Sequence, residues 1–493
     1  MNYELDKPTC SCGIFGVSDH PDASVLTYYG LHALQHRGQE ASGILARAGE
    51  NGKTGFRIIK GHGLVSEVFA DIHEWGPSLQ GDAAIGHNRY STTGASNSRK
   101  NIQPFRVNYH SGNLAVAHNG NLTNENRLRD SLVKEGAIFQ TTSDTEVILH
   151  LIARSKKSDQ IEQITDALNQ LEGAFSLLIL TDNYLVAARD SFGFRPLALG
   201  EIDGRYVVAS ETCAFDIISA RYIRDIEPGE VVIIPRKEEN KAQDLFSLRL
   251  RNDNPTIKHC IFEYIYFSRP DSRIFGHSVD KIRRRLGKIL AKNYPVTDPE
   301  GEKVVVISVP DSSNTAALGY AQQLENDGYK AKFEIGLLRS HYIGRTFIQP
   351  GQDNREMKVK IKFNPVRGVL ENKTVVVVDD SIVRGTTSRQ LISLIREANP
   401  KSIHLRISSP PIMHPCYYGM DFPSKEELIA NEMHGDIDKI KEYIGVDSLK
   451  YLTIDNILES VKEDDPQNYC TACFSGIYPS KVDFSFKKEK YEA

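Results

Sequence analysis

The chain has 493 residues, with 60 Lys and Arg against 64 Asp and Glu, and a formal net charge of -4. This length exceeds what one hydrophobic core supports, so we expect two large domains. The balanced charge argues against nucleic acid or an anionic membrane as a partner, and small substrates are expected. Seven cysteines in a chain without an apolar leader or membrane span favour metal binding or catalysis over disulfides, and a cytoplasmic location.

The first two cysteines, Cys10 and Cys12, stand one residue apart in KPTCSCGIFGV (7–17), and the second precedes a run typical of a buried strand. From Cys12 to about residue 235, short β-rich runs alternate with turn residues. Examples are LAVAHNG (114–120), FSLLILTD (175–182), YLVAARD (184–190), RYVVASE (205–211) and GEVVIIP (229–235). Few long helical patterns accompany them, apart from DTEVILHLIARS (144–155). This pattern predicts an α+β domain with antiparallel sheets.

Residues 236–256 are charged and weakly patterned, so we place the domain boundary there. Beyond it, continuous apolar strands lead into helices: KVVVISVP (303–310) into NTAALGYAQQLEN (314–326), and KTVVVVDD (373–380) into TTSRQLISLIREAN (386–399). Strands buried on both faces have this composition, which predicts a parallel sheet covered by helices.

Two loops fall at the carboxyl ends of these strands, where parallel sheets bind ligands. The first, VPDSSNTAALGYA (309–321), offers free N–H groups to a phosphate, and the alternative on its residues alone is an ordinary helix-capping turn. The second, VVVVDDSIVRGTT (375–387), ends a strand in two acids and opens a helix with Gly-Thr-Thr. Asp379 and Asp380 suit a ribose, with its 5-phosphate on the backbone of residues 384–387; the alternative is a solvated acidic turn.

The second loop resembles the phosphoribosyl-pyrophosphate signature of type I phosphoribosyltransferases. In the first part of the chain, five motifs follow the order found in class II glutamine amidotransferases, which are N-terminal-nucleophile hydrolases. They are CGIFGV (12–17), LQHRGQEASG (34–43), GHNRYSTTG (86–94), AHNGNLTN (117–124) and SDTE (143–146). Over nearly all of residues 12–480 the chain resembles the family that joins these modules, the glutamine phosphoribosylpyrophosphate amidotransferases, in its iron–sulfur and propeptide-containing branch.

The resemblance implies an α+β N-terminal-nucleophile hydrolase domain with stacked antiparallel sheets, followed by an α/β phosphoribosyltransferase domain. The expected division is a propeptide at 1–11, the glutaminase at 12–245, the phosphoribosyltransferase at 257–460 and a C-terminal segment with cluster ligands at 461–493.

For the glutaminase, the resemblance makes Cys12 the nucleophile. A thiol needs a base, and an α-amino group with a pKa near about 7.7–8 serves when it belongs to the nucleophile itself. Residues 1–11 would then be a propeptide that leaves with Cys10. The resemblance makes Asn119 and Gly120 the oxyanion hole and assigns Arg89, Asp144 and Arg37 to glutamine binding, Arg37 by supporting the nucleophile loop. Without the set of motifs, a structural cysteine, surface charges and a turn amide would be preferred.

For the second domain, the resemblance implies that Asp379 and Asp380 hold the ribose hydroxyls and, with Ser312, organise Mg²⁺. Residues 341–368 look like the family's mobile catalytic loop, the alternative being a plain surface excursion. The remaining residues expected to bind phosphoribosyl pyrophosphate are Ser313, Ser381, Arg384, Gly385, Thr386, Thr387 and Arg345.

Cys470 and Cys473 form a CxxC pair, which alone suits zinc, redox or iron–sulfur use. Cys260 and Cys416 lie in stretches that match the cluster-bearing branch. Four thiolates serve Zn²⁺ or a [4Fe–4S] cluster about equally well, and the resemblance favours one structural cluster per subunit. Cys213 is expected in the core.

The implied activity is hydrolysis of glutamine, internal transfer of the ammonia to C1 of phosphoribosyl pyrophosphate, and release of pyrophosphate and 5-phosphoribosylamine, the entry to purine synthesis. A homotetramer inhibited by purine nucleotides is also implied. The alternatives are another class II glutaminase, such as glucosamine-6-phosphate synthase, and a regulatory protein that senses phosphoribosyl pyrophosphate.

Two stretches depart from the family. Arg339, Ser340 and His341 replace the usual Lys-Asn-Arg that enters the mobile loop. The altered cations predict weaker stabilisation of pyrophosphate, or a steeper loss of synthase activity at alkaline pH because the ring at 341 is titratable. Arg283 aligns with a family arginine, but nothing in the sequence explains Ile282 before it.

Overall fold

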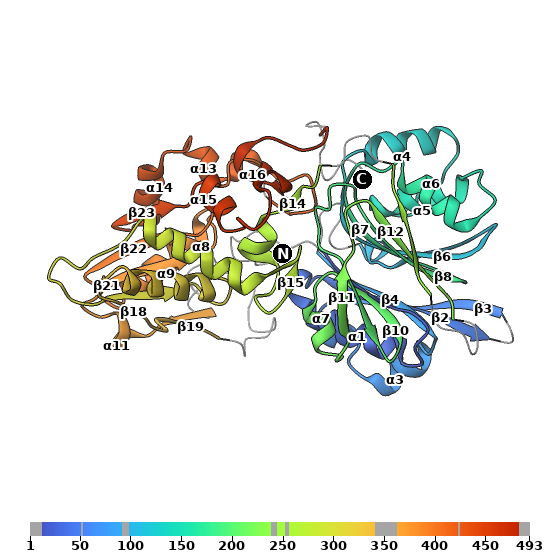
Figure 1. Ribbon diagram of the computed structural model, residues 1–493, viewed down its shortest axis with the longest axis horizontal. Coiled ribbons are helices and arrows are strands. Elements are labelled where there is room, and N and C mark those ends of the chain that lie inside the picture. Colours follow the sequence, from blue (N-terminus) through green and yellow to red (C-terminus); the bar gives the residue numbers. More distant parts are fainter. Residues whose placement is uncertain are drawn as a thin grey trace, which may run out of the picture.

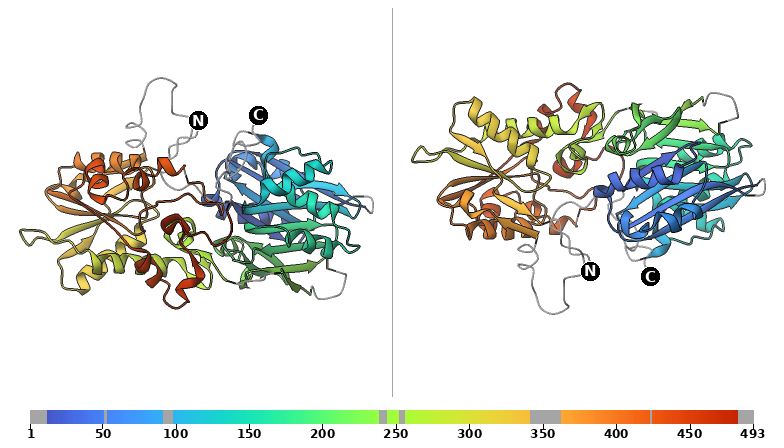
Figure 2. Two further views of the ribbon diagram at one scale, coloured as in Figure 1. Left: turned by 90° about the horizontal axis from the view of Figure 1, so that it is seen from above. Right: turned by 90° about the horizontal axis from the view of Figure 1, so that it is seen from below.

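The computed structural model describes residues 12–50, 53–90, 98–237, 244–251, 256–340, 362–422 and 424–482. We call residues 12–251 the first half and residues 256–482 the second half. The two halves lie side by side along the long axis of the molecule (Figures 1 and 2). Cys10, His341 and Arg345 lie outside the described residues.

Two antiparallel sheets are stacked face to face in the first half. One has the strand order β11 (Arg221–Asp225), β9 (Ala198–Ile202), β10 (Arg205–Ala209), β1 (Gly13–Val17), β4 (Ala83–Arg89), β2 (Ala41–Glu50), β3 (Lys53–His62). The other has the order β13 (Phe246–Arg249), β12 (Glu230–Pro235), β8 (Tyr184–Arg189), β7 (Gly173–Thr181), β6 (Gly112–Leu122), β5 (Phe105–Tyr109). Apolar side chains such as Ile14 and Ile85 from one sheet and Ala117 and Leu178 from the other are fully buried between them. This arrangement confirms the predicted stacked antiparallel sheets.

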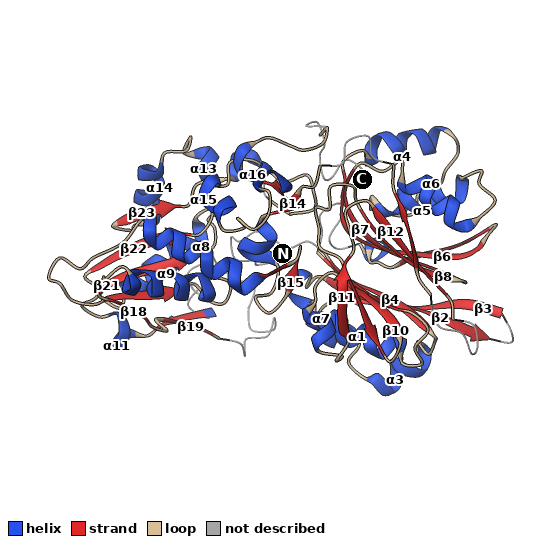
Figure 3. Cartoon of the chain, in the orientation of Figure 1, coloured by secondary structure: helices blue, strands red, loops and turns tan. Residues whose placement is uncertain are grey.

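Helices cover the outer face of each sheet, which gives four layers (Figure 3). The β1 sheet is covered by α1 (Ala23–Ala33), α2 (Val65–Val68), α3 (Ile72–Ser78) and α7 (Cys213–Asp216). The β6 sheet is covered by α4 (Glu125–Lys134), α5 (Thr145–Arg154) and α6 (Gln160–Leu168). Cys213 is buried in the core under α1, as expected from the sequence.

The strand β13 lies within the stretch 236–256 that the sequence analysis treated as a boundary. It pairs antiparallel with β12 and so extends the first half beyond residue 245. All four of its side chains are exposed, because it is an edge strand without a helix over it. Its apolar residues Phe246 and Leu248 alternate with Ser247 and Arg249, but the pattern is short and lies within a charged stretch.

The second half contains a parallel sheet, as predicted, in the order β18 (Ala331–Phe333), β17 (Val304–Ser308), β21 (Thr374–Asp379), β22 (Ser402–Ile407), β23 (Ser448–Tyr451). In the central strands β17 and β21, alternate apolar residues enter two different cores. One face packs on α8 (Val279–Asn293) and α9 (Asn314–Asn326). The other packs on α11 (Arg367–Leu370), α12 (Thr386–Arg396), α13 (Ile429–Glu432) and α14 (Ile437–Ile444).

Short elements connect the halves and the C-terminal segment. The two-residue strand β14 (His259–Cys260) pairs in parallel with β24 (Tyr469–Cys470), next to α16 (Ala472–Ser475). A π-helical turn, η3 (Glu263–Phe267), follows β14. The remaining short elements, which lie within one half or the other, are η1 (Gln35–Arg37), η2 (Arg99–Asn101), β15 (Arg273–Ile274), β16 (His277–Ser278), β19 (Leu337–Arg339), β20 (Phe363–Pro365), η4 (Lys425–Glu427), α15 (Ile454–Glu459) and η5 (Pro466–Asn468). Within the described ranges, no helix is both long and apolar enough to cross a bilayer.

Candidate active sites

Cys12 lies at the start of β1, where this strand pairs with β4. Gly13 is opposite Asn88, so Arg89 at the end of β4 comes next to the cysteine. The thiol is buried and donates a hydrogen bond to the Tyr90 carbonyl, with an Sγ–O distance of 3.4 Å. Burial raises the pKa of Cys12 to about 11, against the opposing effects of that hydrogen bond and the Arg89 charge. The thiol of the chain as it stands is therefore protonated near neutral pH, and its attack on an amide requires a base.

Asn119 and Gly120 lie on β6, in the sheet stacked on the β1 sheet. The Gly120 backbone has φ of 151°, and a Cβ placed there would lie 2.0 Å from the Ala174 carbonyl oxygen, so only glycine fits. The amide nitrogen and oxygen of Asn119 are both buried, and neither has a hydrogen-bond partner among the described residues. A buried amide left unsatisfied in this way costs stability, which is typical of a group kept for a ligand.

Asp144 precedes α5 and accepts a hydrogen bond from the Leu122 N–H at 3.0 Å, two residues beyond Gly120. Burial raises the pKa of this carboxyl, but the neighbouring His118 and the hydrogen bonds from Leu122 and Thr145 hold it below its usual value. Asp144 is therefore ionised at neutral pH, and its charge is felt at Cys12. The anion of Asp144 and the cation of Arg89 are suited to the two charged ends of an amino acid.

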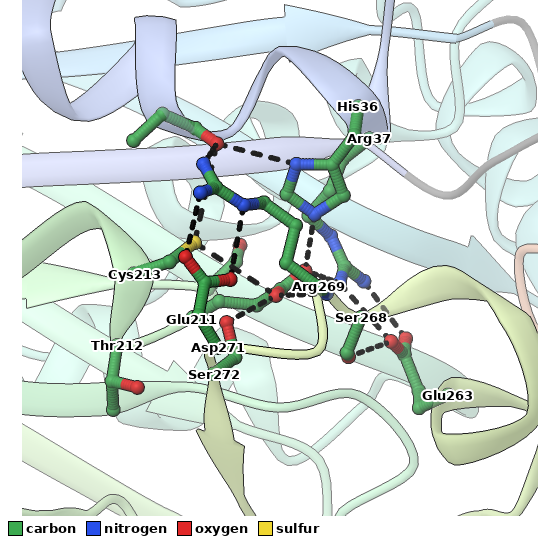
Figure 4. A network of polar contacts seen from close by, with 12 residues as sticks. His36, Arg37, Glu211, Thr212, Cys213, Glu263, Ser268, Arg269, Asp271 and Ser272 are labelled. Carbon is green, nitrogen blue, oxygen red and sulfur yellow. Dashed lines mark hydrogen bonds and ion pairs between the residues drawn. The ribbon is translucent and has the colours of Figure 1, made fainter. Parts of the chain in front are cut away.

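Arg37 is completely buried, and Figure 4 shows its guanidinium bonded to the carboxylates of Glu211 and Glu263. Its Nε donates to the Cys12 carbonyl at 3.2 Å, and its terminal nitrogens bind Glu211 and Glu263. A guanidinium held on all sides in this way favours the supporting role over direct contact with glutamine.

In the second half, the two loops predicted separately meet at the carboxyl ends of the neighbouring strands β17 and β21. The Ser312 hydroxyl donates to Asp380 at 2.5 Å, and the Ser313 hydroxyl donates to Asp379 at 3.1 Å. Ser381 also donates to Asp380, at 2.6 Å. Both carboxylates are almost completely buried. Carboxylate and hydroxyl oxygens are ligands of the kind that Mg²⁺ prefers.

The loop that follows the acid pair is shaped to receive a phosphate. Gly385 has φ of 77°, and a Cβ there would lie 2.5 Å from Ile429 Cδ1. α12 begins directly after it, with Thr386 and Thr387 in its first turn, so that the N–H groups of this turn point out of the helix N-terminus, where an anion is favoured. Arg384 is turned to the surface, where it binds Glu427 at 3.1 Å, and Arg339 binds Asp311 at 3.1 Å.

The structure gathers the four predicted cluster cysteines at the junction of the halves. Cys260 and Cys470 are directly opposite each other in the β14–β24 pair. The N–H groups of Met413 and His414 both bond to the Cys473 carbonyl at 3.0 Å, which brings the Cys416 loop to Cys473. Burial, followed by the charges of the other three cysteines, raises the pKa of the Cys473 thiol. All four thiols are free of disulfides.

These thiols do not converge on one point. In the part of the chain that the structure describes, no group of three or more His, Cys, Asp or Glu side chains is arranged to hold a single metal ion. Four cysteine thiols brought together from separate segments are a donor set that serves both a [4Fe–4S] cluster and Zn²⁺.

Comparison with known proteins agrees with this geometry. A glutamine amidotransferase domain model matches residues 87–216. The amidophosphoribosyltransferase of Bacillus subtilis is 47% identical over 487 residues, which cover 98% of this chain and 97% of that protein. The chain belongs to the amidophosphoribosyltransferases. It is also 51% identical to the chloroplastic amidophosphoribosyltransferase of Vigna aconitifolia, over 96% of this chain and 92% of that protein.

A solved structure extends the likeness to the whole fold. Glutamine phosphoribosylpyrophosphate amidotransferase from B. subtilis, complexed with ADP and GMP, has a TM-score of 0.85 and 44% identity, covering 96% of this chain and 98% of that chain. As an amidophosphoribosyltransferase, the protein catalyses the first committed step of purine biosynthesis. A match over both halves excludes the two alternatives, a glutaminase joined to a different synthase and a regulatory protein.

Sequence reasoning missed the buried charges that join the halves, which are Glu211, Glu263 and Arg195. Glu263, three residues after Cys260, is not among the residues that the sequence analysis singles out. Its signal was present, because a single acid inside the apolar run IFEYIYF (261–267) is a charge that the fold must bury. Its arginine partners lie too far away in sequence to be inferred from any pattern.

Proposed function

We propose that the Cys12 thiolate attacks the amide carbon of glutamine after residues 1–11 have been removed. The α-amino group freed on Cys12 takes the thiol proton, which the buried thiol cannot lose unaided near neutral pH. Asn119 and the Gly120 N–H stabilise the tetrahedral oxyanion. Arg89 binds the α-carboxylate and Asp144 the α-ammonium group. The observation that supports this scheme most is the buried Asn119 amide, which has no hydrogen-bond partner in the described part of the chain.

At the second site, Asp379 and Asp380 bind the ribose hydroxyls, and residues 381–387 with Ser312 and Ser313 bind the phosphates. Ser312, Asp379 and Asp380 would hold Mg²⁺, which when bound neutralises charge on the departing pyrophosphate. Ammonia from the first site attacks C1 of the sugar as the bond to pyrophosphate breaks. The contact between Asn121 and the Tyr417 carbonyl, at 3.0 Å, supports internal transfer because it closes the halves against each other beside Gly120. Arg345 and the loop around it complete the site.

Asn119→Ala is expected to lower kcat for glutamine hydrolysis about 10²- to 10³-fold with little change in KM, because the amide acts on the oxyanion and not on bound glutamine. The unfolding temperature should not fall, since no hydrogen bond among the described residues is lost. Steady-state kinetics and thermal melts measure both. Asn113→Ala, on the same strand but bonded to Asp182 at its far end, is the control. Equal losses in the two variants would contradict the assignment.

We further propose that Cys260, Cys416, Cys470 and Cys473 hold one [4Fe–4S] cluster per subunit with a structural role. Cys473→Ser should reduce iron and sulfide from about four atoms each per chain to near zero. Its unfolding temperature should fall by several degrees, because the C-terminal segment loses its tie to β14. Cys213→Ser, at a buried cysteine outside the group, should keep both values of iron and sulfide. About one zinc per chain in the purified protein would contradict the proposal.

The remaining expectations belong to the same proposal. They are a homotetramer, inhibition by purine nucleotides, a cytoplasmic location, and the division at residues 1–11, 12–245, 257–460 and 461–493, with the unit 12–245 extended to include β13. The nucleotides in the B. subtilis structure support the second of these.

A further inference from the structure

Four buried charged side chains form a network at the junction of the halves, and the partly exposed His36 contacts this network at Glu211. Arg37, Glu211, Arg195 and Glu263 are fully buried, with side chains that are 0% exposed. Arg37 binds Glu211 at 2.5 Å and Glu263 at 2.8 Å, and Arg195 binds Glu263 at 3.1 Å. Two cations face two anions, so the group is neutral as a whole.

Only Glu263 in this group comes from the second half. Its carboxylate accepts from both terminal nitrogens of Arg37, at 3.0 and 2.8 Å, while the Nε of the same guanidinium donates to the Cys12 carbonyl at 3.2 Å. Two bonds to Glu263 set the plane of the guanidinium, and the plane sets the direction of the Nε–H. Figure 4 shows Glu263 and Ser268 approaching Arg37 from the side opposite Glu211.

The second half also fixes Glu263 itself. The Ser268 hydroxyl donates to its Oε2 at 2.8 Å. Arg283, buried on α8, donates to the Tyr264 carbonyl at 2.7 Å and to the Ser268 carbonyl at 2.8 Å, so the turn η3 is held at both ends. The position of the Cys12 backbone therefore depends on a carboxylate whose own position is set by the helix layer of the other half.

We infer that Glu263 is a positioning residue for the glutaminase reaction, through which the phosphoribosyltransferase half holds the nucleophile loop of the other half in its reactive geometry. This rests on the proposed role of Cys12. A displacement of about 1 Å at a nucleophile costs about 100-fold in rate, and Glu263 controls a displacement of this kind. The glutamine-binding groups Arg89 and Asp144 are not part of the cluster, so glutamine binding should change little.

The test is Glu263→Gln in the full chain. The amide cannot accept from both terminal nitrogens of Arg37, so kcat with glutamine should fall about 10- to 100-fold while KM for glutamine changes less than about threefold. Inactivation by a diazoketone analogue of glutamine, followed as adduct mass on Cys12, should slow by the same factor. Synthesis from free ammonia and the Kd for phosphoribosyl pyrophosphate should stay within about twofold. Rates are normalised to the fraction of chains that begin at Cys12.

Glu230→Gln is the matched control. Glu230 is a buried carboxylate that accepts hydrogen bonds from both terminal nitrogens of Arg224, at 2.7 Å each, and does not contact Cys12. If Glu263→Gln is insoluble, Ser268→Ala tests the inference instead, because it removes one hydroxyl that orients Glu263. Glutamine-dependent turnover should then fall about two- to fivefold, with ammonia-dependent turnover unchanged. Parallel loss of both activities, or equal behaviour of Glu263→Gln and Glu230→Gln, would overturn the inference. Glutamine-dependent turnover in Cys12→Ala would instead overturn the role of Cys12.

Discussion

Replacement of Cys12 by alanine is expected to abolish glutamine-dependent synthesis, by about 10⁴-fold or more, and to leave synthesis from free ammonia within about twofold of the parent enzyme. The amide of glutamine is a poor electrophile, so its hydrolysis depends on the covalent step that the thiolate provides. The second site, which lies at the parallel sheet of the other half, has no contact with this sulfur among the described residues. Pyrophosphate release with each nitrogen source at saturating phosphoribosyl pyrophosphate measures the two activities.

Cys213→Ala is the control for the loss of a buried sulfur. Cys213 lies in the core below α1 and, like Cys12, has a thiol whose pKa is raised by burial. The Cys213→Ala variant should be less stable, but it should not lower synthesis from glutamine more than synthesis from ammonia. Glutamine-dependent turnover that survives in Cys12→Ala would show that another residue is the nucleophile.

Asp380→Asn is expected to have the second largest effect, and it should act on both nitrogen sources. The carboxylate accepts from Ser312 at 2.5 Å and from Ser381 at 2.6 Å, so its charge lies between the pyrophosphate loop and the phosphate loop. An amide in its place binds sugar hydroxyls and Mg²⁺ poorly. Synthesis with glutamine or with ammonia should fall about 100-fold or more, and the Kd for phosphoribosyl pyrophosphate should rise at least about tenfold.

Asp298→Asn controls for the removal of a buried charge from the same half. Its carboxylate accepts from Thr374 at 2.6 Å, at the opposite end of the strand that leads to Asp379. Synthesis should remain within about threefold of the parent enzyme in this variant. If Asp380→Asn lowers synthesis from glutamine but not synthesis from ammonia, the assignment of Asp380 to the second site is contradicted.

The sequence predicted the fold where apolar patterns are strong. The runs at 175–182 and 373–380 form β7 and β21, and the helix expected in 144–155 is α5. The prediction missed β13, because the alternation of Phe246 and Leu248 with polar residues is short and lies within the charged stretch 236–256. Local motifs also predicted Asn119 and the acid pair as site residues, since each lies next to a recognisable strand end.

The partners of those residues were beyond sequence reasoning. Arg37 binds Glu211 and Glu263, which are 174 and 226 residues away, and no spacing rule connects them. Likewise, the motif AHNGNLTN does not reveal that the Asn119 amide is buried without a hydrogen-bond partner among the described residues, because that depends on the packing of two sheets. Contacts of this kind follow only from the three-dimensional fold.

The most direct test of the account is the intact mass of the purified, denatured protein, with its N-terminal residue read and the site of a glutamine-analogue adduct mapped. The account predicts a chain that begins at Cys12 and carries the adduct on that residue. A chain that retains residues 1–11 and still turns over glutamine at full rate would contradict it, because the thiol would then have no α-amino group to serve as its base.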